Sequence, residues 1–217
     1  MTRPAPHTKT RILEAARRLF HEQGFVATGV STILREAGVK SGSLYHFFPS
    51  KEELLLAVLE YYEELLEPRV MGPAEETSKD PIGRVFGLLK LYRSGLESTG
   101  CTMGCPIGNL ALEVGDSLPK ARRLIDLNLK NWIGRVEAWL RAAGDRLPAD
   151  LDRRALAQFV LTVMEGGILQ ARAASSLSPF DASVAQLRLY FDLLVERARH
   201  GRARQGPGWK AESGGIR

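Results

Sequence analysis

The sequence has 217 residues, of which 44% are hydrophobic and 25% are charged, and it carries a formal net charge of +5. This length suits a small domain joined to a larger body with a real core, and the basic balance permits nucleic-acid binding without establishing it. No run is long and apolar enough to cross a membrane, the start of the chain lacks a signal-peptide core, and only two cysteines occur, which together predict a cytoplasmic protein.

Helices are predicted at the start of the chain. The first is predicted over residues 8–23, because an apolar stripe recurs at helical spacing before Gly24: Ile12, Leu13, Ala16, Leu19 and Phe20. Thr28 is predicted to cap the second helix, which extends to Ala37 and buries Val30, Ile33 and Leu34. Gly38 can then end that helix in the left-handed conformation that glycine adopts without strain.

A third short helix follows the turn at Gly38. Residues 41–48 are too few to form a stable helix alone, so apolar anchors must hold it against its neighbours: Leu44, Phe47 and Phe48. Pro49 stops this helix, and Ser50 with Glu53 forms a capping box for the next helix, predicted over residues 50–67. Two short helices about a glycine turn are the layout of a helix-turn-helix, whose second helix enters the DNA major groove.

The charge distribution agrees with this interpretation. Before Ser50 the cations are Arg3, Lys9, Arg11, Arg17, Arg18, Arg35 and Lys40, against Glu14, Glu22 and Glu36. The following helix is acidic. Positive charge is therefore concentrated on the proposed DNA-reading segment, as phosphate binding requires.

Two segments carry a resemblance to a known family. Residues 37–54, AGVKSGSLYHFFPSKEEL, and residues 12–25, ILEAARRLFHEQGF, resemble the DNA-binding domain of the bacterial tetracycline-repressor (TetR) family. The resemblance implies an all-α fold with a three-helix DNA-binding domain over residues 1–51 and a helical effector-binding and dimerisation domain over residues 52–200. It also implies these DNA contacts: Thr28, Lys40, Ser41, Gly42, Ser43, Tyr45, His46 and Lys51. Gly29 departs from the family, whose members often carry a hydroxyl residue there, so one phosphate contact is in doubt.

The rest of the chain reads as helices with short breaks and shows no strand periodicity. Helices are predicted over residues 82–98, 106–114, 118–143, 151–175 and 180–200. Residues 68–81 are polar and rich in Pro and Gly, which predicts a linker, and residues 201–217 are predicted to be a disordered tail.

The last two long helices are the predicted dimer interface. Their apolar positions are Leu156, Phe159, Val160, Val163, Gly167 and Leu169, followed by Val184, Leu187, Tyr190, Phe191 and Leu194. Gly166 and Gly167 are unfavourable in mid-helix unless a neighbouring helix crosses closely there. The alternative is that both helices only complete the core of one subunit. A twofold dimer would present two heads to successive major grooves about 34–36 Å apart, and hence would bind a near-palindromic operator.

Cys101 and Cys105 lie in a Gly- and Pro-rich turn that runs into a helix at Pro106. A helix N-terminus lowers a thiol pKa, so Cys105 could be a redox or electrophile sensor, alone or through a disulfide with Cys101. A similar Gly-Cys-x-x-Gly-Asn run occurs in TetR-like proteins that respond to electrophiles. The competing interpretation is a pair of small buried hydrophobes. Two thiols without a nearby His or acid are too few ligands for a metal.

An effector pocket is expected, by the resemblance, among the helices of residues 82–175. Its candidate lining is Phe86, Leu89, Tyr92, Cys105, Asn109, Trp132, Trp139, Phe159, Met164 and Gln170. Trp132 and Trp139 share one helix face, a spacing more typical of core than of a ligand cage, and Glu113 or Glu165 could orient a ligand. The histidines are scattered and no catalytic motif occurs.

The sequence therefore predicts a homodimeric, ligand-responsive DNA-binding repressor without cofactor or metal, and not an enzyme. The alternatives are a thiol sensor and a helical interaction protein that does not bind DNA.

Overall fold

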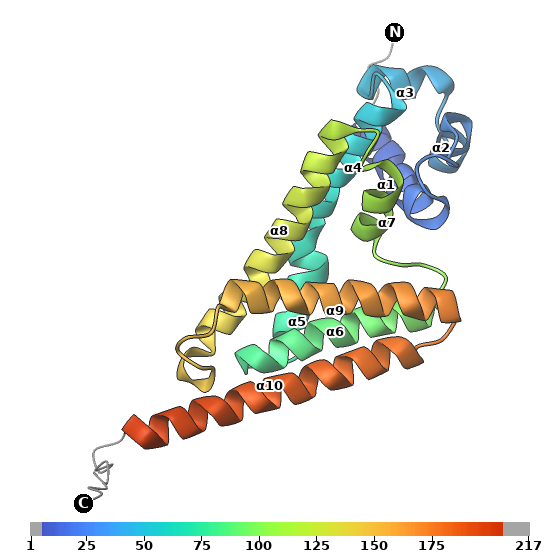
Figure 1. The fold of residues 1–217 in the computed structure, drawn as a ribbon. Coiled ribbons are helices and arrows are strands. Elements are labelled where there is room, and N and C mark those ends of the chain that lie inside the picture. Colours follow the sequence, from blue (N-terminus) through green and yellow to red (C-terminus); the bar gives the residue numbers. More distant parts are fainter. Residues whose placement is uncertain (1–5, 206–217) are drawn as a thin grey trace, which may run out of the picture.

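The computed structural model describes residues 6–205, and this part of the chain forms helices and no strand. A small head consists of α1 (Pro6–Gln23), α2 (Val30–Ala37) and α3 (Ser41–Phe47), drawn in blue in Figure 1. Ile12, Phe20, Ile33 and Leu44 are almost completely buried at its centre. The apolar spacing predicted for these helices is therefore the spacing of the head's core.

A long helix leads out of the head. α4 (Lys51–Leu66) begins where predicted, because the Ser50 side chain accepts a hydrogen bond from the Glu53 amide at 3.1 Å. It lies beside α8 (Pro119–Ala142) along most of its length (Figure 1). Between the two helices, the buried Asn128 side chain donates to the Leu59 carbonyl at 3.0 Å and to the Leu124 carbonyl at 2.9 Å.

The predicted linker over residues 68–81 is wrong for most of its length. α4 continues into a π-helical turn, η1 (Glu67–Met71), and then into α5 (Gly72–Glu76), which leaves only residues 77–80 outside a helix. Pro68 and Pro73 do not break the chain, because both lie where one type of helix passes into another and the backbone stays in the right-handed helical region there. Pro81 begins α6 after an extended residue, where no amide donor is needed. Asp80 then caps α6 (Pro81–Ser98) by accepting from the amides of Ile82 and Gly83.

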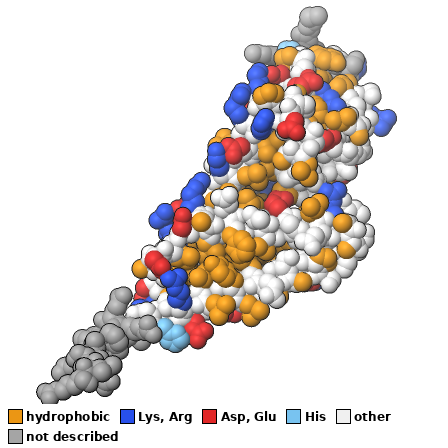
Figure 2. Space-filling model, in the orientation of Figure 1, with side chains coloured by type: hydrophobic (Ala, Val, Ile, Leu, Met, Phe, Trp, Pro, Cys, Tyr) orange, Lys and Arg blue, Asp and Glu red, His pale blue; other side chains and the backbone are white. Residues whose placement is uncertain are grey.

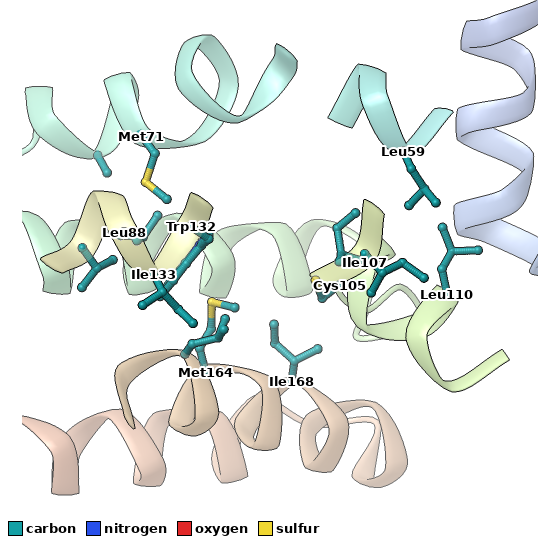
Figure 3. Packing of buried hydrophobic residues seen from close by; sticks show 14 of the residues in the cluster. Leu59, Met71, Leu88, Cys105, Ile107, Leu110, Trp132, Ile133, Met164 and Ile168 are labelled. Atoms are coloured by element: carbon teal, nitrogen blue, oxygen red, sulfur yellow. The ribbon is translucent and has the colours of Figure 1, made fainter. Parts of the chain in front are cut away.

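The body is completed by α7 (Pro106–Val114), α8, a short 3₁₀ turn (Gly144–Arg146), α9 (Arg153–Ala174) and α10 (Ser178–Gln205). α9 and α10 lie side by side below the head, with α6 behind them (Figure 1). Gly167 permits this packing, because a Cβ there would lie 3.0 Å from the Phe180 ring of α10. Met164 and Ile168 of α9 face Trp132 and Cys105 in the core (Figure 3).

Two further expectations concern the end of the chain and membranes. The predicted start of the tail at residue 201 is wrong, because α10 continues to Gln205. Arg202 forms an ion pair with Asp145 at 2.9 Å, which ties this last turn to the body. The rest of the predicted tail, residues 206–217, lies outside the described residues. Within residues 6–205 no helix has the length and apolar character needed to span a bilayer.

Candidate nucleic-acid interface and effector cavity

The helix-turn-helix exposes one side of α3. Gly38 adopts a φ of +60° and ends α2, which turns the chain toward α3. Leu44 and Phe48 are buried and fix α3 on the head, whereas the Tyr45 side chain is 59% exposed and His46 is also exposed. A Cβ at Gly42 would meet no described residue within 4 Å. The first turn of α3 is thus open to an approaching backbone.

The assignment of Thr28 as a helix cap and DNA contact is wrong in this arrangement. Gly29 occupies the N-cap position of α2 and has no side chain with which to cap it. Thr28 lies one residue earlier, is completely buried, and donates its hydroxyl to the carbonyls of Gly24 at 2.6 Å and Leu19 at 3.3 Å. Its hydroxyl therefore supports the turn after α1 and is not available to phosphate.

The other predicted DNA contacts differ in availability. Lys40 is exposed, Ser43 is half-buried, and Ser41 opens α3. Lys51 folds back onto the head, with its ammonium 4.3 Å from the centre of the Phe25 ring and 3.4 Å from the Val26 carbonyl. Burial lowers the pKa of Lys51.

Several head cations are already engaged. Arg11 donates to the Gly38 carbonyl, Arg17 pairs with Glu14, and Arg18 pairs with Glu22 and Glu36. Arg35 and Lys40 are exposed and form no ion pair within residues 6–205, whereas Arg3 lies outside the described residues. The basic excess of the head is therefore partly used to hold its own helices together.

The body holds the head through a carboxylate that sequence reasoning did not place here. Glu113 of α7 accepts hydrogen bonds from the backbone amides of Phe25 at 2.8 Å and Val26 at 2.7 Å. Gly24 adopts a φ of +84°, and a Cβ there would lie 2.9 Å from the Glu113 carboxylate. The turn between α1 and α2 is thus clamped by one side chain, and we call this contact the Glu113 clamp.

A second contact joins the head to the loop before α7. The His21 Nε2–H of α1 donates to the Gly104 carbonyl at 2.6 Å. Burial lowers the pKa of His21, and the nearby guanidinium groups of Arg17 and Arg172 lower it further. The imidazole is therefore neutral near pH 7 and serves as a hydrogen-bond donor between the two parts of the protein.

His21 also lines a cavity of about 310 Å³. Its other walls come from η1, the second half of α6, the loop at residues 99–105, Pro106 and Ile168. η1 is the direct continuation of α4, and His21 lies on α1. The cavity is therefore bordered both by α1, a helix of the head, and by the continuation of α4, the helix that leads out of the head.

A neighbouring cavity of about 470 Å³ lies between α7 and α9. Cys105 and Ile168 border both cavities. Asn109 lines the second one and accepts a hydrogen bond from Arg172 at 2.8 Å.

The ten predicted effector residues do not gather at one site. Tyr92 and Cys105 line the 310 Å³ cavity, and Asn109 lines the second. Phe86 and Leu89 instead face a groove between α6 and α10, where Phe86 packs edge-on against Phe191 with ring centres 5.4 Å apart.

The remaining five lie in the core or on the outer face. Trp132 donates to the Tyr92 hydroxyl at 3.0 Å and Trp139 to Glu75 at 2.7 Å, so both indoles are buried and satisfied. Met164 is buried as well. Phe159 and Gln170 are exposed on α9 and border a shallow groove of about 630 Å³ facing away from the core. The way in which α8 and α9 pack therefore directs these five side chains into the core or onto the outer face, and not into one pocket.

The expectation of a lowered thiol pKa at Cys105 is wrong. Cys105 does cap α7, with its sulfur 3.4 Å from the Gly108 amide. Burial nevertheless raises the pKa of Cys105, and the charge of Glu165 beside it raises it further. Cys101 and Cys105 are both buried free thiols. Cys105 therefore does not have the exposed, cation-flanked setting that a redox-sensing thiolate requires.

The outer face of α9 and α10 is rich in large exposed hydrophobic side chains. They are Phe159, Leu169, Leu189, Tyr190 and Leu193. The rings of Phe159 and Tyr190 contact each other edge-on with centres 5.8 Å apart. Several residues predicted for the interface instead lie inside the subunit: Leu156, Val160, Gly167, Leu187, Phe191 and Leu194. On the face shown in Figure 2, hydrophobic side chains gather over the body below the head.

Comparison with known proteins places the chain among bacterial regulators. The profile of bacterial regulatory proteins of the tetR family matches residues 12–58, and the C-terminal domain profile of LmrA/YxaF-like transcriptional regulators matches residues 81–186. The HTH-type transcriptional regulators YxaF and LmrA of Bacillus subtilis are 31% and 30% identical to the chain. Each alignment covers 79% of this chain, and the two alignments cover 88% of the length of YxaF and 90% of the length of LmrA.

Solved structures agree. The regulatory protein TetR from Rhodobacter sphaeroides superposes with a TM-score of 0.75 at 28% identity, covering 83% of this chain and 96% of that one. The reduced form of NemR from Escherichia coli superposes with a TM-score of 0.72 at 25% identity, covering 83% and 95%.

Proposed function

The chain belongs to the TetR family of bacterial regulatory proteins, and we propose that it acts in the cytoplasm as a homodimeric repressor that a small effector releases from its operator. The chain has the family's DNA-binding head and ligand-binding helical body. The observation that carries the proposal is the cavity of about 310 Å³, because it is bordered both by α1, through His21, and by the continuation of α4, through Arg69 and Val70.

The DNA contacts proposed are those on the exposed side of α3 and its flanks. We assign base contacts to the exposed Tyr45 and His46, and phosphate contacts to the exposed Lys40 and to the open backbone at Gly42. Lys51 can join them by leaving the Phe25 ring. Thr28 acts indirectly, by holding the turn that orients α2.

The proposed dimer forms through α9 and α10 of two subunits. Five large hydrophobic side chains are exposed on this pair, and burying them supplies the driving force for association. Gly166 lies on the same outer face, where a Cβ would meet no described residue within 4 Å, so a partner helix can approach closely. Twofold symmetry then places two heads on one operator.

Release follows from a population shift between two head positions. An effector that fits the cavity better when η1 and the loop at residues 99–105 have moved would change the orientation of the head through α4 and through the His21 and Glu113 contacts with the head. Effector binding and operator binding would then oppose each other reciprocally.

The test begins with genomic DNA captured by the purified protein and sequenced. We expect a near-palindromic site. The logarithm of the association constant for this site should fall linearly with the logarithm of the salt concentration. Lys40→Gln should reduce the steepness of that line by about two, because the homodimer loses one phosphate-bound cation from each of its two heads, whereas Lys79→Gln, an exposed change on the body, should not. Absence of any captured sequence in both reducing and oxidising buffer, with no bound small molecule in the purified protein, would overturn the DNA-binding proposal.

A further inference from the structure

The cavity of about 310 Å³ has an unusual charge pattern. Among the described residues, no Asp or Glu lines it, and Arg69 is the one charged residue of its lining at neutral pH. Burial keeps the other titratable groups neutral, because it lowers the pKa of His21 and raises the pKa values of Tyr92 and Cys105. The lining of the cavity therefore carries a positive charge and no negative one.

Arg69 is held at the edge of this cavity by the π-helical turn η1. Its side chain is exposed, and within the described residues it makes no hydrogen bond or ion pair. Its neighbour Glu67, in contrast, is paired with Arg135 at 2.7 Å. Single π-helical turns occur often at functional sites, since they turn side chains out of helical register.

Among the described residues, no carboxylate near the cavity is hydrogen-bonded or ion-paired to Arg69. Glu14 of α1 is near enough for Arg69 to lower its pKa, but this carboxylate is bonded to Tyr61 and Arg17. Glu22 of α1 pairs with Arg18. Arg17 and Arg172 add positive potential, as the lowered pKa of His21 reflects. Glu165 of α9 lies beyond Cys105 and borders the other cavity instead.

The remainder of the cavity is mainly apolar. Val70, Leu91, Leu96, Met103 and Ile168 form its walls. Ser98 and Thr99 donate their hydroxyls to the Gly95 carbonyl, and the Tyr92 oxygen accepts from Trp132. The volume lies at the small end of the range for ligand pockets.

We propose that this cavity binds an amphipathic monoanion, whose carboxylate pairs with Arg69 and whose apolar body lies between α6 and the loop at residues 99–105. Arginine pairs with a carboxylate through two parallel hydrogen bonds, and the apolar walls accept a chain or ring of moderate size. The regulatory meaning of this site rests on the proposed function. Arg69 belongs to the turn that continues α4, the helix that leads to the head. A ligand whose carboxylate pairs with Arg69 would therefore act directly on that helix.

The test uses three probes with one shape and different charges: octanoate, 1-octanol and octylammonium. Their affinities for the full-length protein are measured by calorimetry at low salt. We expect octanoate to bind about tenfold more tightly than 1-octanol, and octylammonium to bind more weakly than either. Arg69→Gln should remove the preference for octanoate, and Arg69→Lys should retain part of it. Arg123→Gln, an exposed change on α8, is the matched control.

A second variant locates the site without changing charge. Gly95 borders the cavity, and a Cβ there would meet no described residue within 4 Å. Gly95→Leu should therefore fold normally and weaken all probes that enter the cavity. Equal binding of octanoate and octylammonium, or an octanoate preference that survives Arg69→Gln, would overturn the proposal.

The operator affinity measured in the same samples separates the two proposals. Octanoate bound through Arg69 with unchanged operator affinity supports the anion site and contradicts effector release at this site. Release of the operator by neutral or cationic molecules, together with no octanoate binding that depends on Arg69, leaves the repressor proposal intact and contradicts the anion site.

Discussion

The Glu113 clamp gives the most direct test of how the body holds the head. Glu113→Ala removes a carboxylate that accepts from two backbone amides, at 2.8 and 2.7 Å. A hydrogen bond to a charged group contributes about 1.5–3 kcal/mol. The Val26 amide is exposed and water can replace its partner, so the Phe25 amide, which is partly buried, accounts for most of the loss. We therefore expect the free energy of unfolding to fall by about 2 kcal/mol.

The assay is urea unfolding followed by circular dichroism, with every variant at one protein concentration because a dimer's stability depends on concentration. Glu22→Ala is the matched control, since it removes an exposed carboxylate that pairs only with Arg18 among the described residues and should cost about 0.5 kcal/mol or less. Glu113→Gln should fall between the two, because its amide oxygen can still accept one of the two bonds.

The same variant bears on regulation. A head released from the clamp would respond less to the cavity, so effector should change operator affinity by a smaller factor in Glu113→Ala than in the native protein. A Glu113→Ala protein as stable as Glu22→Ala and with undiminished effector response would refute the reasoning.

Three other predictions follow from buried or exposed side chains. Thr28→Val should destabilise the protein by about 1–2 kcal/mol, seen in urea unfolding, because two carbonyls lose their donor. Phe159→Asp should raise the dimer dissociation constant about thirtyfold or more by sedimentation, since a twofold interface contains this ring twice, whereas the exposed Leu127→Asp on α8 should not. Burial raises the pKa of Glu165 above 4.5, so the folded chain holds a proton that the unfolded chain has lost, and stability falls as pH rises from about 4.5 to the folded pKa. Glu165→Gln should flatten this dependence of stability on pH. The same variant should speed the alkylation of Cys105 by iodoacetamide, because the Glu165 carboxylate helps to keep the thiol protonated. Equal alkylation rates in the variant and the native protein would contradict this role of Glu165.

Local chemistry in the sequence predicted much of the fold. The Ser50 cap, the left-handed Gly38 and the Pro106 helix start each depend on residues within one turn of one another, so their signals survive in any context. The prediction for Thr28 is wrong by one position, because Gly29 is the cap of α2 and the Thr28 hydroxyl points inward. The prediction for the segment after α4 is wrong because Pro68 and Pro73 lie at the junctions of η1 and α5, where the backbone stays in the right-handed helical region.

The effector cavity depends on contacts that no local pattern contains. The Glu113 clamp joins residues 88 positions apart, and His21 meets Gly104 across 83 positions. The crossing of neighbouring helices decides which side of α6 or α9 faces the cavity, and so the spacing of Phe86 and Phe159 alone indicates the wrong surface. The expected lowering of the Cys105 thiol pKa is wrong for a related reason, since burial, with Glu165 beside the thiol, outweighs the effect of the helix amides.

Asn128 constrains how α4 can move. Its amide lies buried between α4 and α8 and donates to the Leu59 carbonyl, so sliding the two helices past each other would leave a buried donor without an acceptor. Tilting about this point keeps the bond. Leu59 lies near the middle of α4, which makes the helix a lever with its fulcrum between the cavity and the head. A displacement of η1 in one direction would therefore swing the DNA-reading end in the opposite direction, and the heads of a twofold dimer would change their separation by up to twice that swing.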